Sequence, residues 1–141
     1  MTRIGLVGCV KSKLPHPAPA ADLYTSPPFR GARRAVEWSC DRWFILSAEH
    51  GLVDPGQVLD PYERTLATAP TAERRRWAQG VLAQIDEHLG DVGGIDFEVH
   101  AGTAYLEYGL KAGLAARGAH VVDPLQGLPL GRRLAYYKAL D

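Results

Sequence analysis

Apolar residues in this chain fall into short continuous runs, separated by longer stretches in which they recur with helical spacing. Runs that are apolar on both sides are typical of strands buried in a parallel sheet. We predict strands near residues 4–9, 42–47, 95–101 and 119–122. We predict helices over residues 27–39, 71–89, 103–117 and 130–140. The helix over 71–89 has the clearest spacing, because Trp77, Val81 and Ile85 recur at every fourth position.

This alternation of strands and helices predicts an α/β fold. Successive strand–helix–strand units are right-handed. Connected in this way, the four predicted strands form a parallel sheet in the order 2-1-3-4. With helices on both faces, the result is a three-layer α/β/α domain with a four-stranded parallel sheet. The sequence has no internal repeat and no linker, so we expect one domain over residues 1–141.

Reactive and charged groups follow the first predicted strand. Ligands of open α/β sheets bind outside the carboxyl ends of the strands. Cys9, Lys11 and Lys13 come directly after the first apolar run. The two lysines suit an anionic ligand, and nearby ammonium groups could also lower the pKa of the thiol and make Cys9 a nucleophile. A small cysteine that closes a buried strand is the structural alternative.

The second and third strands also end in candidate site residues. The second ends at Ser47 and leads into Glu49 and His50, either of which could act as a general base. Little regular spacing follows up to about residue 68, which predicts a functional loop. The third strand is followed by Gly102 and Thr103, which should face the Cys9 loop across the point where the strand order reverses.

Two tyrosines in loops are candidates for stacking on a planar ring. Tyr24 and Tyr62 follow proline-rich segments that should cross the same edge of the sheet, although simple packing explains them as well. Basic residues form two groups on predicted helices. They are Arg30, Arg33 and Arg34 in one group and Arg74, Arg75 and Arg76 in the other. Each group could contact phosphate or remain solvated.

Composition narrows the function classes. The chain has 141 residues, 46% of them hydrophobic, and 16 basic residues balance 16 acidic ones. Zero net charge argues against electrostatic binding of nucleic acid over the whole protein surface. It is compatible with binding through a local basic patch. We expect a cytoplasmic protein, since it has two cysteines, no signal-peptide pattern and no membrane-length apolar run. Five histidines without ligand spacing predict no metal site, and we expect no cofactor.

Four motifs make the chain resemble a known family. They are Gly8-Cys9-Val10-Lys11-Ser12-Lys13, Asp22-Leu23-Tyr24-Thr25-Ser26-Pro27-Pro28-Phe29, Leu46-Ser47-Ala48-Glu49-His50-Gly51-Leu52 and Pro61-Tyr62-Glu63-Arg64-Thr65-Leu66. Together they resemble the DUF6884 family of uncharacterised bacterial and phage proteins. The Cys-x-x-x-Lys start and the strand order are more distantly similar to the uracil-DNA-glycosylase-like domain of archaeosine-synthesis enzymes. The glycosylase motif Gln-Asp-Pro-Tyr-His is missing after the first strand.

The resemblance implies a uracil-DNA-glycosylase-like or flavodoxin-like fold and a nucleobase, nucleoside or nucleotide as ligand. Our leading hypothesis is an enzyme that cleaves or exchanges an N-glycosidic bond, with Glu49 as the carboxylate. Lys11 and Lys13 would then hold phosphate or the departing base, and Tyr24 would stack on it. The alternatives are a non-catalytic module that binds nucleic acid or a nucleotide through its basic groups, and a thiol enzyme that uses Cys9. The oligomeric state stays open.

Overall fold

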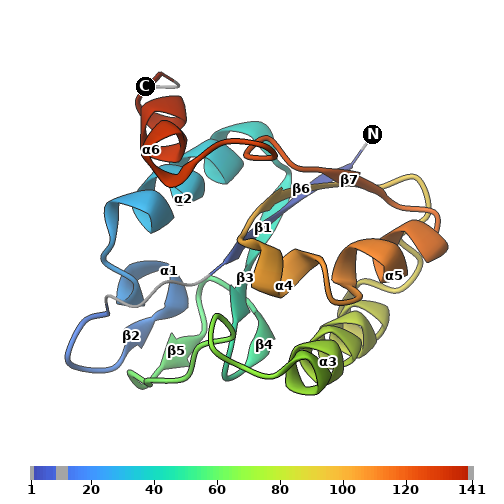
Figure 1. Ribbon diagram of the computed structural model, residues 1–141, viewed down its shortest axis with the longest axis horizontal. Helices are drawn as coiled ribbons and strands as arrows, with labels where there is room; N and C mark the ends of the chain where they lie inside the picture. Colours follow the sequence, from blue (N-terminus) through green and yellow to red (C-terminus); the bar gives the residue numbers. More distant parts are fainter. Residues whose placement is uncertain (1, 9–12, 140–141) are drawn as a thin grey trace.

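A mostly parallel five-stranded sheet forms the centre of the protein. The computed structural model describes residues 2–8 and 13–139 of the chain. The strands lie in the order β4-β3-β1-β6-β7 (Figure 1). Their bounds are Gly51–Val53 for β4, Arg42–Ser47 for β3, Arg3–Gly8 for β1, Asp96–His100 for β6 and His120–Val122 for β7. All neighbouring pairs are parallel except β3 and β4, which are antiparallel.

The strand count differs from the sequence-based prediction. The four parallel strands follow the predicted order 2-1-3-4, but the prediction of only four strands is wrong because β4 is added at one edge. Gly51 adopts a φ of 73°, so the chain reverses directly after β3 and pairs back onto it. A strand of three residues has too little alternation to stand out from a loop in sequence.

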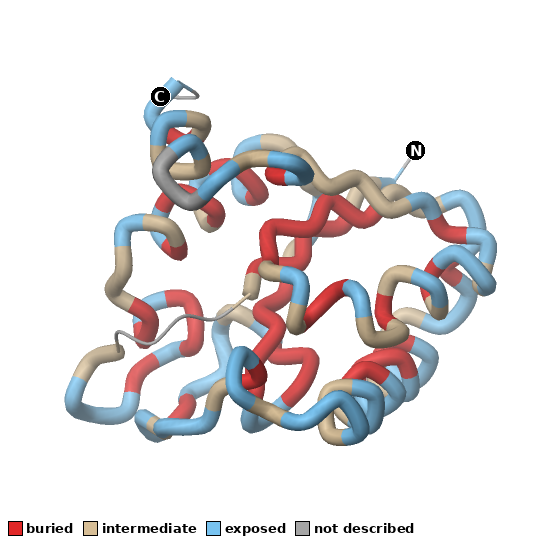
Figure 2. The backbone as a smooth tube through the Cα atoms, in the orientation of Figure 1, coloured by how far each residue is buried: buried red, intermediate tan, exposed pale blue. Residues whose placement is uncertain are grey.

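Helices cover both faces of the sheet (Figures 1 and 2). One face packs against α1 (Ala20–Leu23), α2 (Pro27–Ser39) and α6 (Leu130–Ala139). The other packs against α3 (Thr71–Leu89), α4 (Thr103–Leu106) and α5 (Leu110–Ala116). Leu6 and Val7, neighbours on β1, belong to the two opposite cores because successive strand residues point to opposite faces. Figure 2 shows the central strands as the most continuously buried part of the chain.

Three of the four predicted helices are confirmed, as α2, α3 and α6, and one is wrong. Helix α2 begins where Ser26 Oγ accepts a hydrogen bond from the Phe29 amide at 3.3 Å, and α3 has the predicted bounds. The single helix predicted over residues 103–117 is instead α4 and α5, because the chain breaks at Gly109 with a φ of 127°. Thr103 is the first residue of α4, and the cap position belongs to Gly102.

The predicted loop between residues 47 and 68 contains β4 and one strand of a second small sheet. Strand β5 (Val58–Leu59) pairs antiparallel with β2 (Ala18–Pro19), and Lys13 forms an isolated bridge with Tyr24. These pairings fasten two loops beside the carboxyl end of the parallel strands. Within the described residues, no helix has the length and apolarity needed to cross a bilayer.

Helix α6 is held against α2 by close contact at a glycine. A Cβ added at Gly31 would lie 2.6 Å from the Tyr137 ring. We expect Gly31→Ala to lower the free energy of unfolding by roughly 1–2 kcal/mol, because overpacking outweighs the gain in helix propensity. Urea unfolding measures the change. Gly80→Ala in α3 is the matched control, since a Cβ there meets no atom within 4 Å. We expect the control to be neutral or stabilising, and equal effects at both glycines would contradict the packing argument.

Candidate functional site

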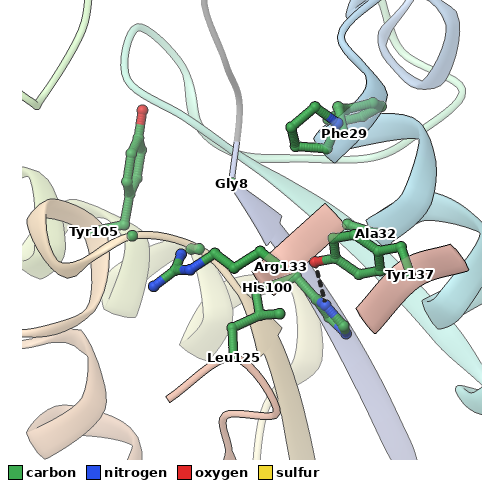
Figure 3. A pocket seen from close by; sticks show the side chains of 11 residues that line it. Gly8, Phe29, Ala32, His100, Tyr105, Leu125, Arg133 and Tyr137 are labelled. Atoms are coloured by element: carbon green, nitrogen blue, oxygen red, sulfur yellow. Dashed lines mark hydrogen bonds between the residues drawn. The ribbon is translucent and has the colours of Figure 1, made fainter. Parts of the chain in front are cut away.

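A cavity of about 270 Å³ lies at the carboxyl ends of β1 and β6 (Figure 3). This is the point where the strand order reverses, the usual ligand position in an open α/β sheet. Phe29 and Leu125 contribute apolar walls, and Tyr105 stands on the opposite side from Phe29. Among the residues that the structure describes, the polar side chains that line it are those of His100, Tyr105, Arg133 and Tyr137. Its lining is therefore largely apolar, with a few polar groups gathered near β6 and α6.

A chain of buried polar groups runs beneath this cavity. Glu98 and His100 are two residues apart on β6 and so point to the same face of the sheet. His100 Nε2 lies 2.9 Å from Glu98 Oε2, and His100 Nδ1 lies 2.8 Å from the Tyr137 hydroxyl. Ser39 Oγ donates to Glu98 Oε2 at 3.0 Å, and Arg3 Nη1 donates to Glu98 Oε1 at 3.2 Å. This chain of hydrogen-bonded side chains connects the solvent-facing Arg3 to the cavity wall at Tyr137.

The environment keeps Glu98 ionised and Tyr137 protonated. Burial opposes ionisation of Glu98, but the hydrogen bond and charge of His100, with help from Ser39 and Arg3, lower the pKa of its carboxyl group. Burial raises the pKa of the Tyr137 hydroxyl. An ionised carboxylate only accepts hydrogen bonds, so His100 Nε2 carries a proton. Nδ1 then accepts from Tyr137 when the ring is neutral and donates to it when the ring is protonated.

Several of the predicted site residues meet in a second cluster, at the carboxyl end of β3. Tyr62 is its centre, because its hydroxyl lies 2.7 Å from Ser47 Oγ and 2.5 Å from the Tyr24 hydroxyl. The Lys13 ammonium lies 4.5 Å from the centre of the Tyr62 ring. The His50 ring meets that ring edge-on at 5.5 Å, and the His50 amide donates to Ser47 Oγ. Ser47 is fully buried, whereas His50 is exposed.

This cluster adjoins the cavity through one aromatic contact. The Tyr24 ring lies 4.9 Å from the Phe29 ring, which forms a wall of the cavity. Gly102 also lines the cavity, whereas Thr103 is exposed at the start of α4. The structure therefore brings most of the predicted ligand-binding residues to one edge of the sheet.

Glu49 occupies a different place from the cavity. It is exposed in the turn after β3 and lines a surface pocket together with Arg64, Glu73 and Arg76. Cys9 and Lys11 lie outside the described residues, so their roles in a ligand site stay predictions. No group of three or more metal-ligating side chains occurs within residues 2–8 and 13–139.

Sequence reasoning missed the polar chain beneath the cavity. A signal for part of it exists, since Asp96, Glu98 and His100 alternate with Phe97 and Val99 in a strand that was expected to be apolar on both faces. Polar residues at every second position mark one face of a strand. No comparable signal identifies Tyr137 or Arg133, because their contact with β6 depends on how α6 packs.

Comparisons with known proteins give one result. A protein-family model described as a family of unknown function, DUF6884, matches residues 4–139. No curated protein and no solved structure gives a significant match.

Proposed function

Because the chain belongs to the DUF6884 family, whose function is unknown, we propose a function from the cavity: an enzyme that acts on a nucleobase, nucleoside or nucleotide. The reaction that we propose is cleavage or exchange of the N-glycosidic bond. The observation that carries this proposal is a small, aromatic-walled cavity above a buried carboxylate–histidine–tyrosine chain.

The lining of the cavity suits a planar heteroaromatic ring. Small-molecule sites are mostly apolar, with a few placed polar groups that orient the ligand. Phe29, Tyr105 and Tyr137 are aromatic residues of its lining, while Arg133 offers donors for carbonyl or phosphate oxygens. The volume of about 270 Å³ suits a ligand as small as a single base. The resemblance to uracil-DNA-glycosylase-like domains points to the same ligand class.

The buried chain can supply the proton that such a reaction requires. When an N-glycosidic bond breaks, the base departs with the bonding electrons and needs a proton or a hydrogen bond. We propose that Tyr137 passes its proton to the base and is reprotonated by His100, so that no phenolate accumulates. Glu98 would stabilise the protonated imidazole that begins the step. Water attacking the sugar would return a proton to the chain.

The parallel strand order supports a finer fold assignment. Flavodoxin-like sheets place their first four parallel strands in the same order, 2-1-3-4. We propose that this domain is a variant of a uracil-DNA-glycosylase-like or flavodoxin-like fold, with the antiparallel β4 at its edge.

The non-catalytic module has less support from the arrangement of the helices. Its basic residues would come from α2 and α3, yet these helices pack on opposite faces of the sheet (Figure 1). The two arginine groups therefore do not form one continuous surface. The thiol enzyme depends on Cys9, which lies outside the described residues, so it stays a sequence-based hypothesis.

Filling the cavity tests the proposal. We expect Gly102→Leu to weaken binding of the ligand at least about tenfold, because a bulky side chain would compete for the same space. Gly102 lines the cavity with a φ of −77°, and a Cβ there meets no atom within 4 Å, so the change should not strain the backbone. Calorimetry with a panel of bases, nucleosides and nucleotides measures the effect.

The matched control for this experiment is Gly80→Leu, which adds the same side chain to an open position on α3. It should bind like the wild type. If no member of the panel binds the wild type, or if Gly102→Leu binds equally well, the cavity is not the ligand site.

A further inference from the structure

A second pocket, of about 180 Å³, lies between α2 and α6 directly beside the cavity. Tyr137 lines both spaces, so its ring forms a shared wall. The second pocket differs in character, because its other lining residues include Arg30, Arg34 and Lys138. No carboxylate is among the described residues that line it. Positive charge is therefore concentrated next to an apolar, aromatic-walled space.

The basic residues of α2 and α6 differ in how their charges are balanced. Arg33 is paired with Asp22 at 2.9 Å and with Glu37 at 3.3 Å, so its charge is balanced within the protein. Arg30 and Lys138 have no ion pair among residues 2–8 and 13–139. Arg30 and Lys138 therefore bring positive charge to the pocket that no described carboxylate balances.

We propose that the pocket between α2 and α6 binds the phosphate group of a mononucleotide whose base occupies the cavity. This inference rests on the proposed function and makes it more specific, since it selects a nucleotide over a free base or nucleoside. Arginine and lysine are the usual protein ligands of phosphate, and charge-assisted hydrogen bonds are the stronger class.

The geometry favours a mononucleotide over nucleic acid. A polynucleotide needs a basic track that follows its backbone, and the protein has zero net charge. The arginines of α3 lie on the opposite face of the sheet from α2 and cannot extend such a track. The pocket between α2 and α6 is small, at about 180 Å³, which suits one phosphate group better than a chain of them.

The experiment compares each nucleoside with its 5′-monophosphate by calorimetry, on the wild type and on the double variant Arg30→Gln/Lys138→Gln. We expect the wild type to bind the nucleotide at least about tenfold more tightly than the nucleoside. Added salt should reduce this preference. The double variant should lose the preference and keep its affinity for the nucleoside. The control Arg33→Gln/Arg132→Gln removes the same charge from the same two helices, outside the pocket lining, and should keep the preference.

The possible outcomes separate this inference from the proposed function. If nucleosides bind and the phosphate adds nothing, or if the double variant keeps the preference, the phosphate site is wrong and the ligand cavity stands. If neither nucleosides nor nucleotides bind, both proposals are wrong. If a single-stranded oligonucleotide binds more tightly than any mononucleotide and the double variant loses this binding, the proposal of a mononucleotide ligand is wrong and the ligand is nucleic acid.

Discussion

Replacing Tyr137 with phenylalanine is expected to reduce the rate of base release about 10²-fold or more, the usual range for losing a positioned acid or base. The variant keeps the aromatic wall of the cavity, so ligand affinity should change little. It removes the hydroxyl that lies 2.8 Å from His100 Nδ1 and therefore interrupts the proposed proton path from Glu98 and His100 to the cavity. Single-turnover release of free base from a nucleoside or nucleotide measures the rate, and calorimetry measures the affinity.

The neighbouring tyrosine provides the matched control. Tyr136 is on the same helix but does not line the cavity, so Tyr136→Phe should release base at the wild-type rate. Tyr137→Phe leaves a buried imidazole nitrogen without its partner, which costs about 1–3 kcal/mol of stability. The assay is therefore run well below the melting temperature of the variant.

Glu49 supplies the competing assignment. As the carboxylate expected from the sequence, it would stabilise an oxocarbenium-like transition state from its place after β3. In that case Glu49→Gln would reduce turnover, and Tyr137→Phe would not. Since Glu49 lines a surface pocket separate from the cavity, we expect the opposite result. Loss of turnover in Glu49→Gln alone would move the catalytic centre to that pocket.

Much of the sheet can be predicted from the sequence because parallel strands buried on both faces are nearly continuous apolar runs. The runs that contain Leu6 and Ile45 are of this kind, and the short connections between strands and helices leave few possible strand orders. Strand β4 could not be predicted, because it is short and has no long apolar run. It pairs with β3 after the chain reverses at Gly51, and in the sequence Gly51 cannot be told from any other loop glycine.

The candidate site is predictable where it depends on strand ends and unpredictable where it depends on helix packing. Ser47, Tyr62 and Tyr24 share one hydrogen-bonded cluster, as expected for loops that cross the same edge of the sheet. Tyr137 reaches β6 only because Gly31 lets α6 approach α2 closely. No local sequence pattern encodes that approach, so the polar chain beneath the cavity could be found only in three dimensions.

Removing His100 is expected to have the largest effect on stability. We expect His100→Ala to lower the free energy of unfolding by about 3–5 kcal/mol, because truncating a buried ring leaves a cavity and removes a hydrogen-bond partner from both Glu98 and Tyr137. The side chain of His100 is fully buried between Glu98 and Tyr137. Urea unfolding at pH 7 measures the loss.

The control for this loss is another histidine that lies beside a carboxylate. His120→Ala removes a largely exposed side chain 3.4 Å from Asp96, and we expect a change within about 0.5 kcal/mol. Similar losses at His100 and His120 would contradict the idea that burial makes the Glu98–His100 contact important.

The same pair predicts a pH dependence whose sign follows from the lowered pKa of Glu98. A carboxyl group with a lower pKa in the folded state contributes stability that is complete above its unfolded value, near 4.5, and is lost as the pH falls through the folded value. Glu98→Gln has no such contribution. We therefore expect the difference in unfolding free energy between wild type and Glu98→Gln to be constant at neutral pH.

Below about pH 4.5 this difference should shrink, with a slope of at most about 1.4 kcal/mol per pH unit for one group. Urea unfolding of both proteins between pH 3 and pH 7 measures the difference, and the subtraction removes the contributions that other carboxylates make equally to both. A difference that stays constant down to pH 3 would mean that Glu98 does not titrate in this range with the lowered pKa that its contacts imply. The contacts of Glu98 with His100, Ser39 and Arg3 would then give its ionised form no net stabilisation in the folded protein.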